Sequence, residues 1–81
     1  MKVKEIIDKI YDEEYYCIYD DDTTKVVEVD KVENAKVNGT DYDNWEVLDI
    51  EIANFLDKEI KGQRYRNFHC IMINCYNPQE A

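Results

Sequence analysis

The stretch Phe68-His69-Cys70-Ile71-Met72-Ile73-Asn74-Cys75 decides the fold of this 81-residue chain. Apolar side chains occupy both its even and its odd positions, and successive side chains of a strand point to opposite faces. A strand that is apolar on both faces is typical of a central position in a sheet. We therefore expect a sheet built around this final strand, which ends at Asn77-Pro78.

Two strands are predicted upstream. The segments Tyr15–Tyr19 and Lys25–Val29 are rich in aromatic and β-branched residues, and the polar run Asp20–Thr24 between them is typical of a turn. Together they predict a β-hairpin. A weaker strand is expected over Val32–Val37, because Asn38-Gly39 suits a type I′ turn into a further strand.

Residues 43–62 fit two structures. As a helix, they place Trp45, Leu48 and Ile52 on one apolar stripe, and the helical alternative spans residues 44–61. As a strand, Leu48 and Ile52 lie in a run where Ile and Leu alternate with Asp and Glu. We favour a strand over about residues 46–54, followed by a bend or helical turn around residues 55–60.

The N-terminal segment predicts a short amphipathic helix. Val3, Ile6, Ile7 and Ile10 follow the i, i+3, i+4, i+7 spacing of one helix face, and charged residues occupy the other. Such a helix needs a sheet or another helix to cover its apolar stripe. The predicted fold is therefore α+β, with a short N-terminal helix packed on an antiparallel sheet of about four strands in one small domain, residues 1–81.

The charge of the chain is strongly negative. Nineteen Asp and Glu against ten Lys and Arg give a formal net charge of −9, and all of the negative excess lies before residue 61. Direct nucleic acid binding is not expected, because it needs Lys and Arg to neutralise phosphates. No uncharged apolar run is long enough to span a membrane, and the amphipathic N-terminus does not resemble an export signal. A cytoplasmic location is expected.

No catalytic, cofactor-binding or metal site is expected, so the sequence predicts a protein that is not an enzyme. Neighbouring His69 and Cys70 would point to opposite faces of a strand, and no Cys-x-x-Cys pair supports a zinc site. A calcium loop counted from Asp41 would place Ile52 where a bidentate Glu is needed. Three cysteines without a framework spacing, Cys17, Cys70 and Cys75, indicate reduced, buried thiols.

Acidic residues alternate with aromatic ones in several stretches, and this pattern predicts a protein-binding surface. Carboxylates on a rigid surface can occupy the places where a nucleic-acid-binding protein expects phosphates. The alternative is that the excess acid serves solubility alone. The candidate partner-binding residues are Asp12, Glu13, Glu14, Tyr16, Asp20, Asp21, Asp22, Asp41, Tyr42, Asp43 and Glu46.

The chain resembles the small acidic accessory proteins of phages and mobile elements in Gram-positive bacteria. The resemblance lies in the Val3-Lys4-Glu5-Ile6-Ile7 helix, the order of elements and the strand Val47-Leu48-Asp49-Ile50-Glu51-Ile52. It implies a non-enzymatic inhibitor, of the anti-CRISPR or another anti-defence type, that acts in the host cell. Such a protein blocks a bacterial defence effector such as a CRISPR nuclease, in some cases as a DNA mimic. The alternative function is a small structural or adaptor protein, monomeric or homodimeric.

Overall fold

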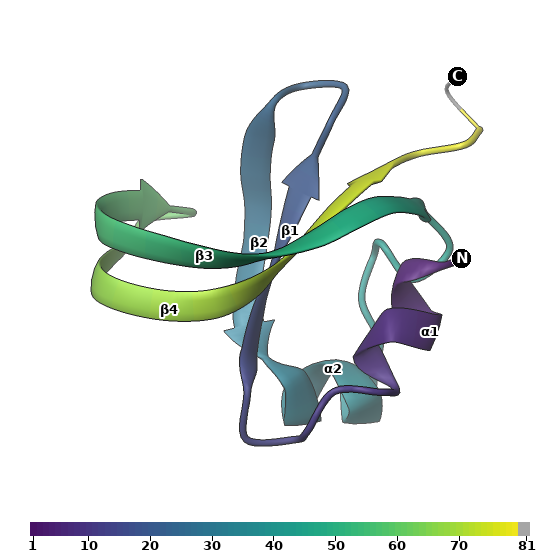
Figure 1. The fold of residues 1–81 in the computed structure, drawn as a ribbon, viewed down its shortest axis with the longest axis horizontal. Coiled ribbons are helices and arrows are strands. Elements are labelled where there is room, and N and C mark those ends of the chain that lie inside the picture. Colours follow the sequence, from purple (N-terminus) through teal and green to yellow (C-terminus); the bar gives the residue numbers. More distant parts are fainter. Residues whose placement is uncertain (80–81) are drawn as a thin grey trace.

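A computed structural model describes residues 1–79, so the last two residues of the predicted 1–81 domain lie outside the described part. It contains two short helices and a four-stranded sheet with the strand order β2-β1-β4-β3 (Figure 1). The α+β class and the four strands are as predicted. The elements in chain order are α1 (Val3–Ile7), β1 (Tyr15–Asp20), β2 (Lys25–Lys31), α2 (Val32–Asn38), β3 (Glu46–Ile60) and β4 (Gln63–Tyr76).

The final strand is central, as the sequence predicts. β4 lies between β1 and β3, and its buried Ile73 lies beside Ile18 of β1. The sheet is mixed rather than wholly antiparallel, because β4 runs parallel to β1. The expected antiparallel pairing holds for β1 with β2 and for β3 with β4. The parallel pair arises because the β3–β4 hairpin joins the sheet through its second strand.

The strand predicted over Val32–Val37 is wrong, because these residues belong to helix α2. Val32 and Ala35, spaced by one helical turn, are both buried against the sheet. Asn38-Gly39 does not form a hairpin turn but ends the helix. Gly39 has φ +73°, and its N–H donates to the carbonyl of Ala35 at 2.8 Å.

Residues 46–60 form one continuous strand, so the helical alternative is wrong, and so is the helical turn expected around residues 55–60. β3 pairs with β4 from Glu46 opposite Tyr76 to Ile60 opposite Gln63. The tight turn lies at Lys61-Gly62, whose φ values of +52° and +81° fit a type I′ turn.

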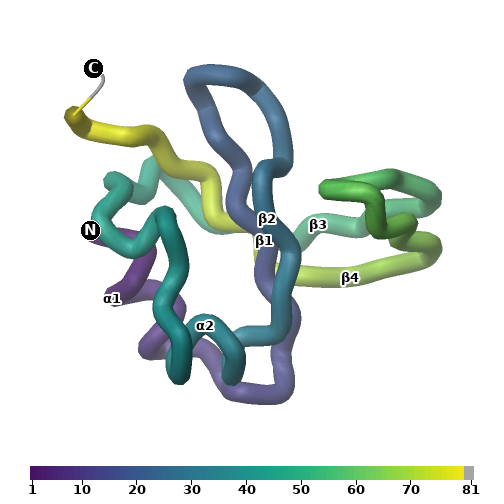
Figure 2. Tube along the Cα trace, turned by 180° about the vertical axis from the view of Figure 1, so that it is seen from behind, coloured from purple at the N-terminus to yellow at the C-terminus, as the bar shows by residue number. Residues whose placement is uncertain are grey.

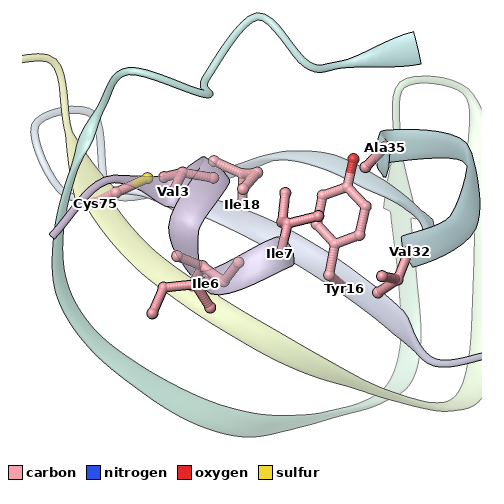
Figure 3. Packing of buried hydrophobic residues seen from close by; sticks show 9 residues of the cluster. Val3, Ile6, Ile7, Tyr16, Ile18, Val32, Ala35 and Cys75 are labelled. Atoms are coloured by element: carbon pink, nitrogen blue, oxygen red, sulfur yellow. The ribbon is translucent and has the colours of Figure 1, made fainter. Parts of the chain in front are cut away.

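The main core lies between the two helices and one face of the sheet. Helix α1 ends at Ile7, earlier than the predicted Ile10, but Ile10 still packs against this core. The buried side chains come from both helices and from β1 and β4 (Figure 3): Val3, Ile6, Ile7, Tyr16, Ile18, Val32, Ala35, Ile73 and Cys75.

A second, smaller cluster lies on the opposite face of the sheet. Cys17, Ala53 and Cys70 are buried there, with Phe55 and Phe68 among the partly buried side chains that pack on them. The far half of the β3–β4 hairpin extends past the other strands and curls, as Figures 1 and 2 show. This curvature lets a sheet of four strands bury apolar side chains on both faces.

Candidate functional site

The predicted partner-binding residues do not form one site. Asp12–Glu14 precede β1, Asp20–Asp22 follow it, and Asp41–Glu46 lie in the segment that leads into β3. β1 has six residues, so its ends are separated by about 17 Å at the usual rise of a strand. The first two groups therefore lie at opposite ends of the β1–β2 hairpin (Figure 1).

The first group is held against helix α2. The N–H of Val32 donates to the carbonyl of Glu14 at 2.8 Å, and the N–H of Glu33 donates to that of Asp12 at 3.2 Å. The Asp12 carboxylate pairs with Lys36 Nζ at 2.7 Å, and this ammonium also donates to the carbonyl of Ile10. The contact between Asp12 and Lys36 thus holds the loop before β1 against helix α2.

Three other acids at this end of the molecule point into solvent. Glu13, Glu14 and Glu33 are exposed, and within residues 1–79 none of them forms an ion pair or a side-chain hydrogen bond. We call these three residues the α2 acidic cluster. Glu33 is absent from the predicted set, because a strand rather than a helix was expected there; a helical interpretation of Val32–Val37 would have placed Glu33 in its first turn.

The second group combines a structural acid with two free ones. Asp20 is only 8% exposed, and its Oδ1 accepts the N–H of Asp22 at 3.0 Å, which closes the turn. The N–H of Asp21 donates to the carbonyl of Cys75 at 2.9 Å and so extends the contact between β1 and β4. A partner contact through Asp20 is therefore wrong, whereas the side chains of Asp21 and Asp22 are exposed.

Tyr16 is a core residue. Its side chain is 1% exposed, and its hydroxyl donates to Glu28 Oε2 at 2.6 Å. Burial, followed by this hydrogen bond, raises the pKa of Tyr16 well above its usual range. The predicted partner contact through Tyr16 is wrong, because the core leaves it no free surface.

The third group fastens the N-terminal segment to the start of β3. Glu46 pairs with Lys2 Nζ at 2.8 Å and with the N-terminal amino group at 3.1 Å. The hydrogen bond from Lys2 comes first among the contacts that lower the pKa of Glu46. Asp43 accepts the Thr40 hydroxyl at 2.9 Å, and its carbonyl accepts the N–H of Lys4. These carboxylates are occupied by contacts within the chain.

An aromatic pair and an open hollow lie beside this third group. Tyr42 packs edge-on against Trp45, with ring centroids 4.8 Å apart, and burial raises the pKa of Tyr42. Asp41 is exposed and forms no ion pair within residues 1–79. It lines a hollow with Asn44, Trp45, Asn77, Pro78 and Gln79.

The three cysteines are buried and free. A hydrogen bond between the Cys17 and Cys70 thiols, together with burial, raises the pKa of Cys17. Burial, with a smaller effect of Asp20, raises the pKa of Cys75 to about 12. A protonated, buried thiol is a poor nucleophile, so Cys17 and Cys75 have the chemistry of small apolar side chains.

No group of three His, Cys, Asp or Glu side chains in residues 1–79 is arranged to hold a metal ion. His69 is exposed and Cys70 buried, as the alternation of the strand predicts. The basic residues of the hairpin offset neighbouring acids, since Arg64 contacts Asp57 at 2.6 Å and Arg66 contacts it at 3.7 Å. Within the same described range, no helix is long and apolar enough to cross a membrane.

Comparisons with models of protein families, with curated proteins and with solved structures found no match to this chain. The resemblance to phage accessory proteins therefore stays a prediction. Any functional assignment rests on where the structure places exposed charge and exposed apolar side chains. By that criterion, the α2 acidic cluster is the candidate site for a basic partner.

Proposed function

We propose that this protein is a non-enzymatic interaction protein whose α2 acidic cluster binds a basic, nucleic-acid-binding surface of another protein. One observation carries the proposal. Glu13, Glu14 and Glu33 are exposed on two segments that main-chain hydrogen bonds join, and no cation pairs with them within residues 1–79. Most other described carboxylates contact a cation or a hydrogen-bond donor.

The cluster is supported by a rigid base. Two main-chain hydrogen bonds and the Asp12–Lys36 ion pair fix the loop against helix α2. Because the backbone of these residues is already ordered, binding costs little further backbone freedom, so more of the charge attraction becomes affinity. Their negative field also speeds association with a basic surface, and this effect weakens as salt rises.

A narrower form of the proposal follows from the resemblance stated above. The protein would be a phage-type, anti-CRISPR-like inhibitor in the cytoplasm of a bacterial host, occupying the nucleic acid groove of a defence effector such as a CRISPR nuclease. Its small size and net charge of −9 suit a DNA mimic. The carboxylates would take the positions of phosphates, since both accept hydrogen bonds from Arg and Lys.

The test compares two variants of equal net charge. One is Glu13→Gln/Glu14→Gln/Glu33→Gln, and the control is Asp21→Asn/Asp22→Asn/Asp41→Asn, which neutralises three exposed acids elsewhere. Each immobilised protein is used to capture a partner from a Gram-positive lysate, with and without competing DNA or RNA. We expect the parent and the control to retain one basic protein that nucleic acid displaces, and the cluster variant to retain at least tenfold less.

Equal capture by both variants would contradict the proposal. Retention that does not change with salt or nucleic acid would contradict it as well, because contacts between exposed charges are screened within about 10 Å at 0.1 M salt. Capture of only the protein's own chain would favour the alternative, a structural or adaptor protein whose acidity serves solubility.

A further inference from the structure

β3 is an edge strand whose outer side is only partly covered. The N-terminal residues cover its start, where the N–H of Val47 donates to the carbonyl of Met1 at 2.8 Å. The N–H of Val3 likewise donates to the carbonyl of Trp45 at 3.0 Å. Beyond residue 47, no other strand of the described chain pairs with this side of β3. The edge therefore already pairs with an extended segment at one end and is open along the rest.

One face of this open edge carries exposed apolar side chains. Ile50, Ile52 and Leu56 are 46%, 76% and 71% exposed. Ile50 lies opposite Ile73 in the β3–β4 register, so it shares the face on which the helices pack. The helices leave this part of the face uncovered. The result is an apolar strip, interrupted by Asn54, along an edge whose main-chain groups are free to pair.

On the opposite face, the first half of the same edge is acidic, and Ala53 and Phe55 of the second cluster follow it. Asp49 and Glu51 alternate with the isoleucines, and both are exposed. Asn74 of β4 holds them side by side, because its Nδ2 donates to Asp49 Oδ1 at 2.5 Å and to Glu51 Oε1 at 3.4 Å. Neither carboxylate forms an ion pair with a residue of the described chain.

We propose that the open edge of β3, residues 48–56, binds an extended basic segment of a partner protein as an added strand. Main-chain hydrogen bonds would supply affinity, as in other cases of strand addition. Side chains that lie directly opposite each other on the same face would determine which sequence of added strand is preferred. A segment in which apolar residues alternate with Lys or Arg places its apolar side chains beside Ile50 and Ile52 and its cations beside Asp49 and Glu51.

A second copy of the chain is a poorer occupant of this edge. An antiparallel β3 pair that sets Ile50 opposite Ile52 of the other copy also sets the two Glu51 side chains directly opposite each other. Like charges in that position destabilise strand pairing. The net charge of −9 on each copy adds repulsion. The inference does not depend on the function proposed above, because it uses a different surface and requires no nucleic-acid-binding partner.

The probe is a synthetic peptide of about nine residues that alternates valine and lysine, a length that matches the open edge. It is titrated into the isotopically labelled protein, with chemical shifts and amide hydrogen exchange as readouts. We expect shift changes and increased protection confined to residues 48–56. A matched peptide that alternates valine and glutamate should bind at least tenfold more weakly, because it places like charges beside Asp49 and Glu51.

Two variants of equal net charge separate specific pairing from bulk attraction. Asp49→Asn/Glu51→Gln should weaken binding of the lysine peptide about tenfold, whereas Glu13→Gln/Glu14→Gln should change it less than threefold at the same ionic strength. Circular dichroism checks that both variants fold. Equal losses in the two variants, or shift changes centred on the α2 acidic cluster, would overturn the inference. So would a concentration-dependent dimer that protects the β3 amides without peptide.

Discussion

At the scale of single residues, burial separates side chains that look alike in the sequence. Tyr11 and Tyr16 both flank the acids at positions 12–14, yet Tyr11 is 78% exposed and Tyr16 is 1% exposed. Asp20 and Asp21 are neighbours, but only the Asp21 side chain reaches solvent. An acidic and aromatic composition therefore does not itself define a binding surface; the position of each side chain relative to the core does.

The Tyr16–Glu28 hydrogen bond should be measurable in stability. Tyr16→Phe keeps the ring in the core and removes the hydroxyl that donates to Glu28 at 2.6 Å. A hydrogen bond to a charged group contributes more than an ordinary one, so we expect the free energy of unfolding to fall by about 1–2 kcal/mol at pH 7. Urea denaturation measures this loss, and an unchanged midpoint would contradict it.

The same variant should change the response to alkali. The folded state raises the pKa of Tyr16 above its usual value of about 10, so between these two values the folded chain holds a proton that the unfolded chain releases. Stability from this group is thus fully present below about pH 10 and is lost as pH rises further. We expect the free energies of unfolding of the parent and Tyr16→Phe to converge above pH 10 in denaturation curves. A difference that stays constant with pH would show that ionisation of Tyr16 does not contribute to the pH dependence of stability.

The position of Ile7 in the core predicts a large effect of charge. Ile7 is 2% exposed, so Ile7→Asp should destabilise the fold by about 3–5 kcal/mol, since it buries an unpaired carboxylate and loses apolar burial. Ile52→Asp, at a position that is 76% exposed, is the control and should cost about 1 kcal/mol or less. Equal thermal midpoints for the two variants would contradict the placement of α1.

At the scale of elements, the β3–β4 hairpin depends on a turn that its sequence does not favour. Both Lys61 and Gly62 have positive φ, a conformation that suits Asn and Gly but not Lys. Lys61→Asn should therefore stabilise the protein by about 0.5 kcal/mol. Gly62→Ala should destabilise it by about 1 kcal/mol through backbone strain alone, because nothing lies within 4 Å of the added Cβ. A lower thermal midpoint for Lys61→Asn, or an unchanged or higher one for Gly62→Ala, would contradict the turn type.

At the scale of the whole molecule, excess negative charge opposes compaction. A formal charge of −9 on 81 residues implies self-repulsion that salt screens. We expect the thermal midpoint of the parent to rise as sodium chloride increases from about 0.02 M to about 0.3 M. The Glu13→Gln/Glu14→Gln/Glu33→Gln variant should be at least as stable as the parent and show a smaller rise. An equal response of both proteins would mean that the α2 acidic cluster adds no repulsion.

Part of the candidate site follows from the sequence. Glu13 and Glu14 are exposed acids, as their polar surroundings predict. Glu33 is not predicted from the sequence, because it lies near them only when residues 32–38 form helix α2. The β-branched residues Val32 and Val37 instead favour a strand there. Asp12 and Glu46 are predicted to contact a partner protein. In the structure, the Asp12 carboxylate forms an ion pair with Lys36, and the Glu46 carboxylate forms one with Lys2, both distant in sequence. Pairing between distant residues leaves no local pattern.

The sequence alone determined the apolar face of α1, the β1–β2 hairpin, the central place of β4 and the negative charge of the molecule. Each follows from spacing or composition within a short stretch. The strand favoured over residues 46–54 is confirmed, but only the tertiary structure decided that it continues to residue 60, that residues 32–38 form a helix and that β1 and β4 run parallel. Segments that fit two periodicities, or carry weak ones, adopt the structure that buries their apolar side chains against distant elements. Those contacts exist only once the whole chain has folded.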